Sequence, residues 1–255
     1  MMRSAAGAWG WGSFYAGVLA AWGLLWVMAQ DRARFSGEWG PALLADLCRD
    51  GAAAPGFAAL FAMWAVMAVA MMAPTAVPAF RTWAALPAAA SGGVRGTLAL
   101  GAGYLAVWLG ASAAFAALQQ ALAARGWLAA DGASLSAGLS AGLCALAGAF
   151  QFSRLKSACL SRCRQPLTFF LDRWRPGLPA AFRSGLDLGF VCLGCCWALM
   201  ALAFVGGMSS LVWMGLATAL MVVEKLPDIG RHLTRPLGWA LLAASAVLAL
   251  SGVLA

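Results

Sequence analysis

Six long runs without a charged side chain dominate this chain of 255 residues. They cover residues 4–30, 51–80, 96–124, 132–153, 188–223 and 236–255. Each run can cross a bilayer as a helix, which takes about 20 apolar residues. With 63% hydrophobic and 10% charged residues, the whole chain has the composition of a membrane protein. The sequence therefore predicts one integral membrane domain over residues 1–255.

The fifth run is too long for one crossing. Its 36 residues would form a helix of about 54 Å, against a hydrocarbon core of about 30 Å. We expect it to fold back at Gly206-Gly207, and the alternation of a barrel strand is absent. The predicted fold is an all-α polytopic bundle with helices at about 9–29, 56–76, 97–119, 134–152, 187–205, 209–224 and 236–254. Six would be left if the first helix is a signal peptide that is cleaved.

The cations predict the orientation. If the spans alternate, 13 of the 17 Lys and Arg residues fall on the side of the N-terminus and four on the other side. The positive-inside rule then places the N-terminus in the cytoplasm and the C-terminus outside. The frequent Ala, Gly and Arg favour a bacterial inner membrane. A formal charge of +8 that orients spans gives no reason to expect nucleic acid, and anionic lipid is the expected contact.

Sulfur is unusually abundant, with 7 Cys and 11 Met against a single His. Cys192, Cys195 and Cys196 have i, i+3, i+4 spacing, which puts three thiols on one helical face, and Met200 extends that face. Cys159 and Cys163 are four residues apart in the segment expected to follow the fourth helix on the cytoplasmic side. We expect the two groups to meet in one pocket near the cytoplasmic face.

Methionines recur at four-residue spacing on the second predicted helix, at Met63, Met67 and Met71, with Met72 beside them. Thiolate and thioether ligands without imidazole select soft ions, so Cu(I) is the first candidate and Zn(II) the second, with an iron–sulfur cluster third. With His232 as the one imidazole, a His-based centre is excluded. Met and Cys also fill gaps in helix cores, and packing is the ordinary explanation of the Met stripe.

Three strings add a family resemblance: residues 63–74 (MWAVMAVAMMAP), 151–166 (QFSRLKSACLSRCRQP) and 194–200 (GCCWALM), followed by Trp213-Met214 and Glu224-Lys225. The chain resembles a bacterial family of uncharacterised, predicted metal-binding integral membrane proteins over about residues 56–230. The resemblance implies that the matching positions carry the function. They are Met67, Met71, Met72, Lys156, Cys159, Cys163, Cys192, Cys195, Cys196, Trp197, Met200, Glu224 and Lys225.

Three functions fit these features. The first is a protein that holds a soft metal, most simply Cu(I), for delivery to a membrane or metallochaperone partner. The second is a thiol–disulfide redox enzyme that uses the same cysteines and passes electrons to a quinone. The third is a structural or assembly subunit whose cysteines only pack. No catalytic residue is assigned, and an enzyme is the less expected outcome. Glu224 and Asp187 are expected at cytoplasmic helix ends, where Lys225 and Arg183 could pair with them.

Overall fold

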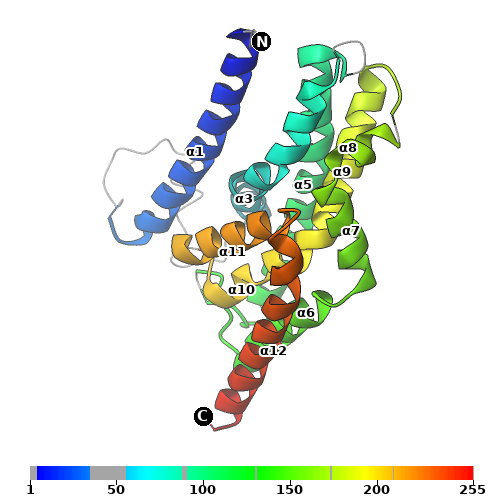
Figure 1. Ribbon diagram of the computed structural model, residues 1–255. Helices are drawn as coiled ribbons and strands as arrows, with labels where there is room; N and C mark the ends of the chain where they lie inside the picture. The colour runs from blue at the N-terminus through cyan, green and yellow to red at the C-terminus, as the bar shows by residue number, and fades with distance from the viewer. Residues whose placement is uncertain are drawn as a thin grey trace.

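A computed structural model describes residues 5–34, 56–87, 91–129, 131–172, 174–208 and 210–254, and these are helical nearly throughout (Figure 1). Between Leu128 and Ser134 lies an isolated β-bridge, and the described residues contain no strand. The helices are α1 (Ala5–Arg34), α3 (Phe57–Ala85), α5 (Gly93–Ala124), α6 (Ala137–Phe150), α7 (Arg154–Arg164), α8 (Pro166–Leu171), α9 (Leu178–Ala201), α10 (Ala203–Gly206), α11 (Leu211–Glu224) and α12 (Gly230–Leu254). The predicted all-α bundle is confirmed.

Five helices of the described residues are long and apolar enough to cross a membrane, namely α1, α3, α5, the unit of α9 with α10, and α12. The other two predicted spans, 134–152 and 209–224, form α6 and α11, which have 14 residues each. A helix of that length measures about 21 Å, less than a hydrocarbon core of about 30 Å. The seven predicted helical regions are therefore present, and two of them are shorter than a full crossing.

The long fifth run turns back where its glycines predicted. Helix α9 ends at Ala201, α10 ends at Gly206, and Gly207 has φ 81°, a conformation that glycine adopts without strain. Ser210 then caps α11 by accepting a hydrogen bond from the Trp213 amide. The Trp213 indole donates to the Leu202 carbonyl at 2.9 Å, which ties α11 to the end of α9.

Helix α3 is fixed to its neighbours by two tryptophan side chains. Pro74 has no amide hydrogen, so the carbonyl of Ala70 loses its partner within the helix. The Trp22 indole of α1 donates to that carbonyl at 3.0 Å. Nearer the start of α3, the Trp64 indole donates to the Gln119 amide oxygen of α5 at 2.8 Å. Trp64 is fully buried, so this bond lies in the bundle interior.

Helices α5 and α9 form the most extensive helix–helix contact, and glycines make it possible. A Cβ atom at Gly103 or Gly185 would collide with the backbone of the facing helix, and one at Gly189 would lie 2.8 Å from Val107. We call this line of contact the glycine seam. Small residues let membrane helices approach closely, so α9 is held directly against α5.

The strongly basic segment that follows α6 contains the short helices α7 and α8 before α9 begins. Ser153 caps α7 by accepting from the Lys156 amide at 3.1 Å, and Pro166 is the first residue of α8. In Figure 1, α7 lies beside α9, while α6 and α12 run together toward the C-terminal end of the molecule. Residues 35–55, between the first two predicted helices, lie outside the described residues, and they include Cys48.

Candidate metal site

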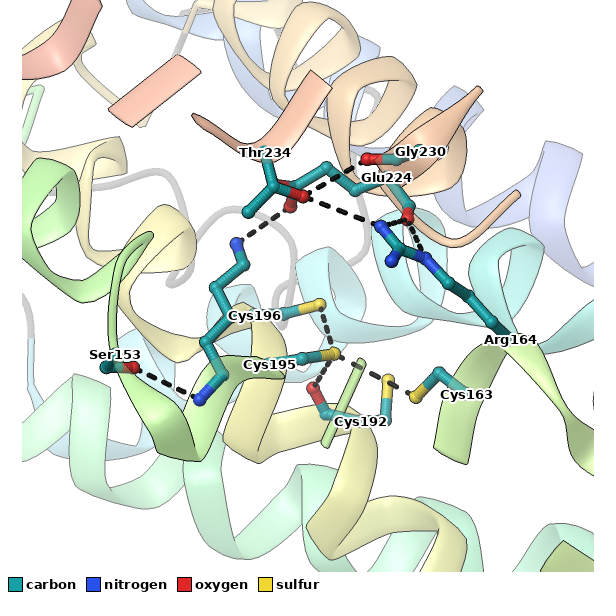
Figure 2. A network of polar contacts seen from close by, with 10 residues as sticks. Ser153, Cys163, Arg164, Cys192, Cys195, Cys196, Glu224, Gly230 and Thr234 are labelled. Carbon is teal, nitrogen blue, oxygen red and sulfur yellow. Dashed lines mark hydrogen bonds and ion pairs between the residues drawn. The ribbon is translucent and has the colours of Figure 1, made fainter. Parts of the chain in front are cut away.

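Cysteines from two separate helices meet in the interior of the bundle (Figure 2). The Sγ atoms of Cys195 and Cys196 on α9 are 3.3 Å apart, and the Sγ of Cys163 on α7 is 3.9 Å from that of Cys195. Cys192, Cys195 and Cys196 are buried, whereas Cys163 is partly exposed. The structure thus joins the loop pair to the helical trio through Cys163, across 32 positions of sequence. We call these four residues the cysteine site.

Cys159, the other thiol of α7, packs directly on the backbone of α9. A Cβ atom at Gly194 would lie 2.7 Å from the Cys159 Sγ, so the missing side chain lets α7 approach. Burial raises the pKa of the Cys159 thiol, and the charge of Arg162 partly offsets this effect. Cys159 is therefore one helical turn from Cys163 and at the edge of the cysteine site, against the residue that precedes Cys195.

Cys192 has a different environment from the other thiols. Its Sγ accepts a hydrogen bond from the Lys225 ammonium at 3.0 Å and lies 3.2 Å from the Tyr104 hydroxyl. Lys225 also donates to the Thr75 hydroxyl at 2.7 Å, and that oxygen is 3.9 Å from the same sulfur. Three polar groups from α3, α5 and the end of α11 therefore surround one buried sulfur atom.

A buried ion pair holds α7 against the end of α11. The Lys156 Nζ and the Glu224 Oε2 are 2.8 Å apart, and their side chains are 0% and 2% exposed. Arg164 adds two bonds to the backbone carbonyl of Glu224, from Nε at 3.0 Å and from Nη2 at 2.8 Å. Helix α7 is therefore attached near both of its ends, at Lys156 and Arg164, and Cys159 and Cys163 lie between the attachments in sequence.

The expected pairing of Glu224 with Lys225 is wrong. Successive residues leave a helix in directions that differ by about 100°, so the two side chains point to different neighbours. Glu224 turns toward Lys156, and Lys225 turns toward Cys192.

The predicted methionines lie in the same core as the thiols. Met67 and Met72 are fully buried, and Met71 and Met200 are 2% and 1% exposed. Met72 also reaches the surroundings of Cys192 through its backbone, because its carbonyl accepts from the Tyr104 hydroxyl at 3.1 Å. Trp197 packs its ring edge-on to Phe150, with the centroids 5.1 Å apart, and closes the side of α9 that faces α6.

Three residues of this region were missed by sequence reasoning: Tyr104, Thr75 and Arg164 in its role as an anchor. Tyr104 had one available signal, since it is one of two tyrosines in the chain and lies inside an uncharged run. A buried tyrosine hydroxyl usually has a hydrogen-bond partner, so a polar group is expected beside Tyr104 in the core. Thr75, next to Pro74, gave no comparable signal.

The sulfur spacing is close to what a shared metal ion requires. With metal–sulfur bonds of about 2.3 Å, two ligands of a trigonal ion are about 4 Å apart. The separation of Cys163 and Cys195 is 3.9 Å, while Cys195 and Cys196 are closer, at 3.3 Å. The Cys195 thiol donates to the Cys192 carbonyl at 3.1 Å, so it must rotate to bind an ion. Accordingly, no group of three or more His, Cys, Asp or Glu side chains in the described ranges is already arranged as a metal site.

The donor set nevertheless suits a soft ion. The described cysteines Cys144, Cys159, Cys163, Cys192, Cys195 and Cys196 are free thiols, and thiolates prefer Cu(I) and Zn(II) to hard ions. A family model described as PpoB2, copper chaperone, matches residues 61–248. This match covers the whole cysteine site and agrees with the resemblance drawn from the sequence strings. Comparisons with the curated proteins and with the solved structures give no significant match.

Proposed function

Because the chain belongs to the PpoB2 copper chaperone family, we propose that it binds Cu(I) at the cysteine site and delivers the ion to another protein. The observation that carries this proposal is the approach of Cys163 to Cys195 within 3.9 Å. Cysteines that only fill space in a helix core have no need to converge from different helices. Cu(I) is bound by two or three soft ligands, and four thiols are available here.

The two helices suit two parts of a delivery cycle. Cys195 and Cys196 are 1% and 2% exposed, so an ion held between them is shielded from water and from competing ligands. Cys163 and Cys159 are partly exposed on α7 and can meet a thiol of a partner. Each thiol gives up its proton when it binds the ion, and one sulfur replaces another without any change in the oxidation state of copper.

The proposed setting is the inner membrane of a bacterium. Five helices are suited to cross a bilayer, and the cation count favours a cytoplasmic N-terminus and an outer C-terminus. The cysteine site then receives copper from the cytoplasmic side, where α7 and its exposed arginines face anionic lipid and partner proteins. A soluble metallochaperone is a suitable partner, because it carries Cu(I) on exposed thiols.

A thiol–disulfide redox enzyme is the second candidate, favoured by the same proximity. A disulfide needs a sulfur separation of about 2.05 Å, and Cys163 and Cys195 need less than 2 Å of further approach to reach it. In that function the two thiols would be oxidised together and their electrons passed to a quinone. Thiol trapping in cells distinguishes the two functions, since a copper carrier keeps both residues reduced.

The direct test is metal binding by the purified protein. Protein in detergent, kept reduced and loaded with Cu(I), is expected to retain copper through desalting, as measured by elemental analysis. The double variant Cys195→Ser/Cys196→Ser is expected to bind Cu(I) at least about 100-fold more weakly, more than the loss of an outer-shell contact causes. Cys144→Ser, a buried cysteine of α6, is the matched control and should bind normally.

Wild-type protein that keeps no copper under these conditions would overturn the proposed function. If the wild-type protein retains zinc instead, and the double variant loses it, the proposed ion would be Zn(II) and not Cu(I). Unchanged copper binding by the double variant would move the site elsewhere in the chain.

A further inference from the structure

Lys225 is a buried cation whose nearest partners are a cysteine sulfur and a hydroxyl rather than a carboxylate. Its side chain is 6% exposed, and its ammonium donates to the Cys192 Sγ at 3.0 Å and to the Thr75 hydroxyl at 2.7 Å. The carboxylate next to it in sequence, Glu224, is occupied by Lys156. A charge inside a membrane protein needs compensation, and intramembrane ionisable residues usually serve a function.

The compensating charge cannot come from the Lys156–Glu224 pair, whose two charges cancel. Arg164 adds a second positive charge on the α7 side, where it binds the Glu224 carbonyl. Lys225 and Arg164 therefore add positive charge around the cysteine site beyond the Lys156–Glu224 pair, and Arg231 adds to it beside Arg164. Thiols that are deprotonated to bind a metal supply negative charge that balances these cations.

The net charge of the metal-loaded site is the sum of the charges of the ion and its thiolates. Cu(I) with two thiolates carries one negative charge, and with three thiolates it carries two. Zn(II) with the same number of thiolates is always one unit more positive. A fixed cation beside the sulfur atoms therefore stabilises the Cu(I) complex by more than the Zn(II) complex, and the difference is large where the dielectric constant is low.

Resting on the proposed function, we infer that Lys225 is a specificity-determining residue that favours monovalent Cu(I) over divalent ions. Its ammonium stays hydrogen-bonded to Cys192 while other lone pairs of that sulfur bind copper. Tyr104, 3.2 Å from the same sulfur, holds Cys192 in place without adding charge. Lys225 does not contact the ion, so it acts on the metal through position and charge alone.

The test compares two metal ions on one variant. In the Lys225→Met variant the side chain is similar in length but uncharged. The purified variant is expected to bind Cu(I) at least about tenfold more weakly, because one partner of a buried charge pair is lost. Competition with a chromophoric Cu(I) chelator measures this affinity. The variant's affinity for Zn(II), measured with a zinc chelator at the same pH, should fall by a smaller factor. Lys225→Arg should restore most of the Cu(I) preference, because it keeps the charge.

Thr218→Val is the matched control, since it removes a buried hydroxyl of α11 that donates to the Met214 carbonyl and leaves Lys225 with both of its partners. It should keep the wild-type ratio of Cu(I) to Zn(II) affinity. Equal losses for both ions in Lys225→Met would overturn the inference and show a purely structural role. Unchanged Cu(I) binding would also overturn it, because Lys225 would then have no effect on the metal. If wild-type protein binds no Cu(I), the proposed function fails first, and the inference fails with it.

Discussion

The two helices that supply the cysteines differ in how they are held. Helix α9 is packed against α5 along the glycine seam, and its three thiols are almost completely buried. Helix α7 is short, has exposed residues along one side, packs on α9 at Gly194, and is attached near both of its ends by polar contacts to Glu224. Close backbone contact fixes α9, while α7 depends in addition on charges and hydrogen bonds. In the proposed function, α9 would retain the ion and α7 would exchange it.

The largest expected change comes from releasing α7. Glu224→Gln leaves the buried ammonium of Lys156 without its counter-charge, which should lower the free energy of unfolding by about 3–5 kcal/mol. Thermal unfolding in detergent measures this loss, and the rate of maleimide labelling at Cys163 should rise as α7 separates from α9. The control is Lys156→Met/Glu224→Met, which removes both charges and should cost less. A single variant as stable as wild type would show that the ion pair does not hold α7.

An intermediate effect is expected when the exchange ligand is removed. Cys163→Ser should slow transfer of Cu(I) to a chelator about tenfold, a barrier change of about 1.4 kcal/mol, because copper must then leave directly from the buried thiols. Equilibrium affinity should fall far less than in Cys195→Ser/Cys196→Ser. Stopped-flow transfer and equilibrium competition measure the two quantities. If the affinity collapses while the rate stays unchanged, α7 retains copper as α9 does, and the distinction is wrong.

The smallest effect is expected at the contact between the two helices. Gly194→Ala places a methyl group 2.7 Å from the Cys159 Sγ, an overpacking that should lower the free energy of unfolding by about 1 kcal/mol. The double variant Gly194→Ala/Cys159→Ala should recover most of the loss, because the colliding atom is gone. Thermal unfolding of the three proteins tests this, and a double variant no better than the single one would place the strain elsewhere.

Much of the fold could be predicted because hydrophobic length is a local property of a membrane sequence. The helical regions and the turn at Gly206-Gly207 follow from it. The late start of α6 could not be predicted in this way. Residues 132–136 carry no charge, as a membrane helix would, yet they form a loop that includes the bridge at Ser134. An uncharged run sets an upper limit on a helix and does not locate its ends.

The grouping of the cysteines could be predicted from the sequence, whereas several of their contacts with other residues could not. The spacing of Cys192, Cys195 and Cys196 revealed a shared face, since that spacing is local to one helix. The approach of Cys163 depends on how α7 packs against α9, and the contact of Lys225 with Cys192 depends on where α11 ends. Such contacts arise from tertiary packing, and no short stretch of sequence contains them.

The glycine seam has a consequence for the cysteine site, although its glycines lie outside that site. Gly185 and Gly189 lie within two turns of Cys192 on the same helix, so their close fit to α5 sets how far the trio stands from Tyr104. A methyl group added at either glycine would collide with α5, and α9 would have to move away from it. The absence of side chains at these two positions thus sets how closely the cysteines of α9 approach α5.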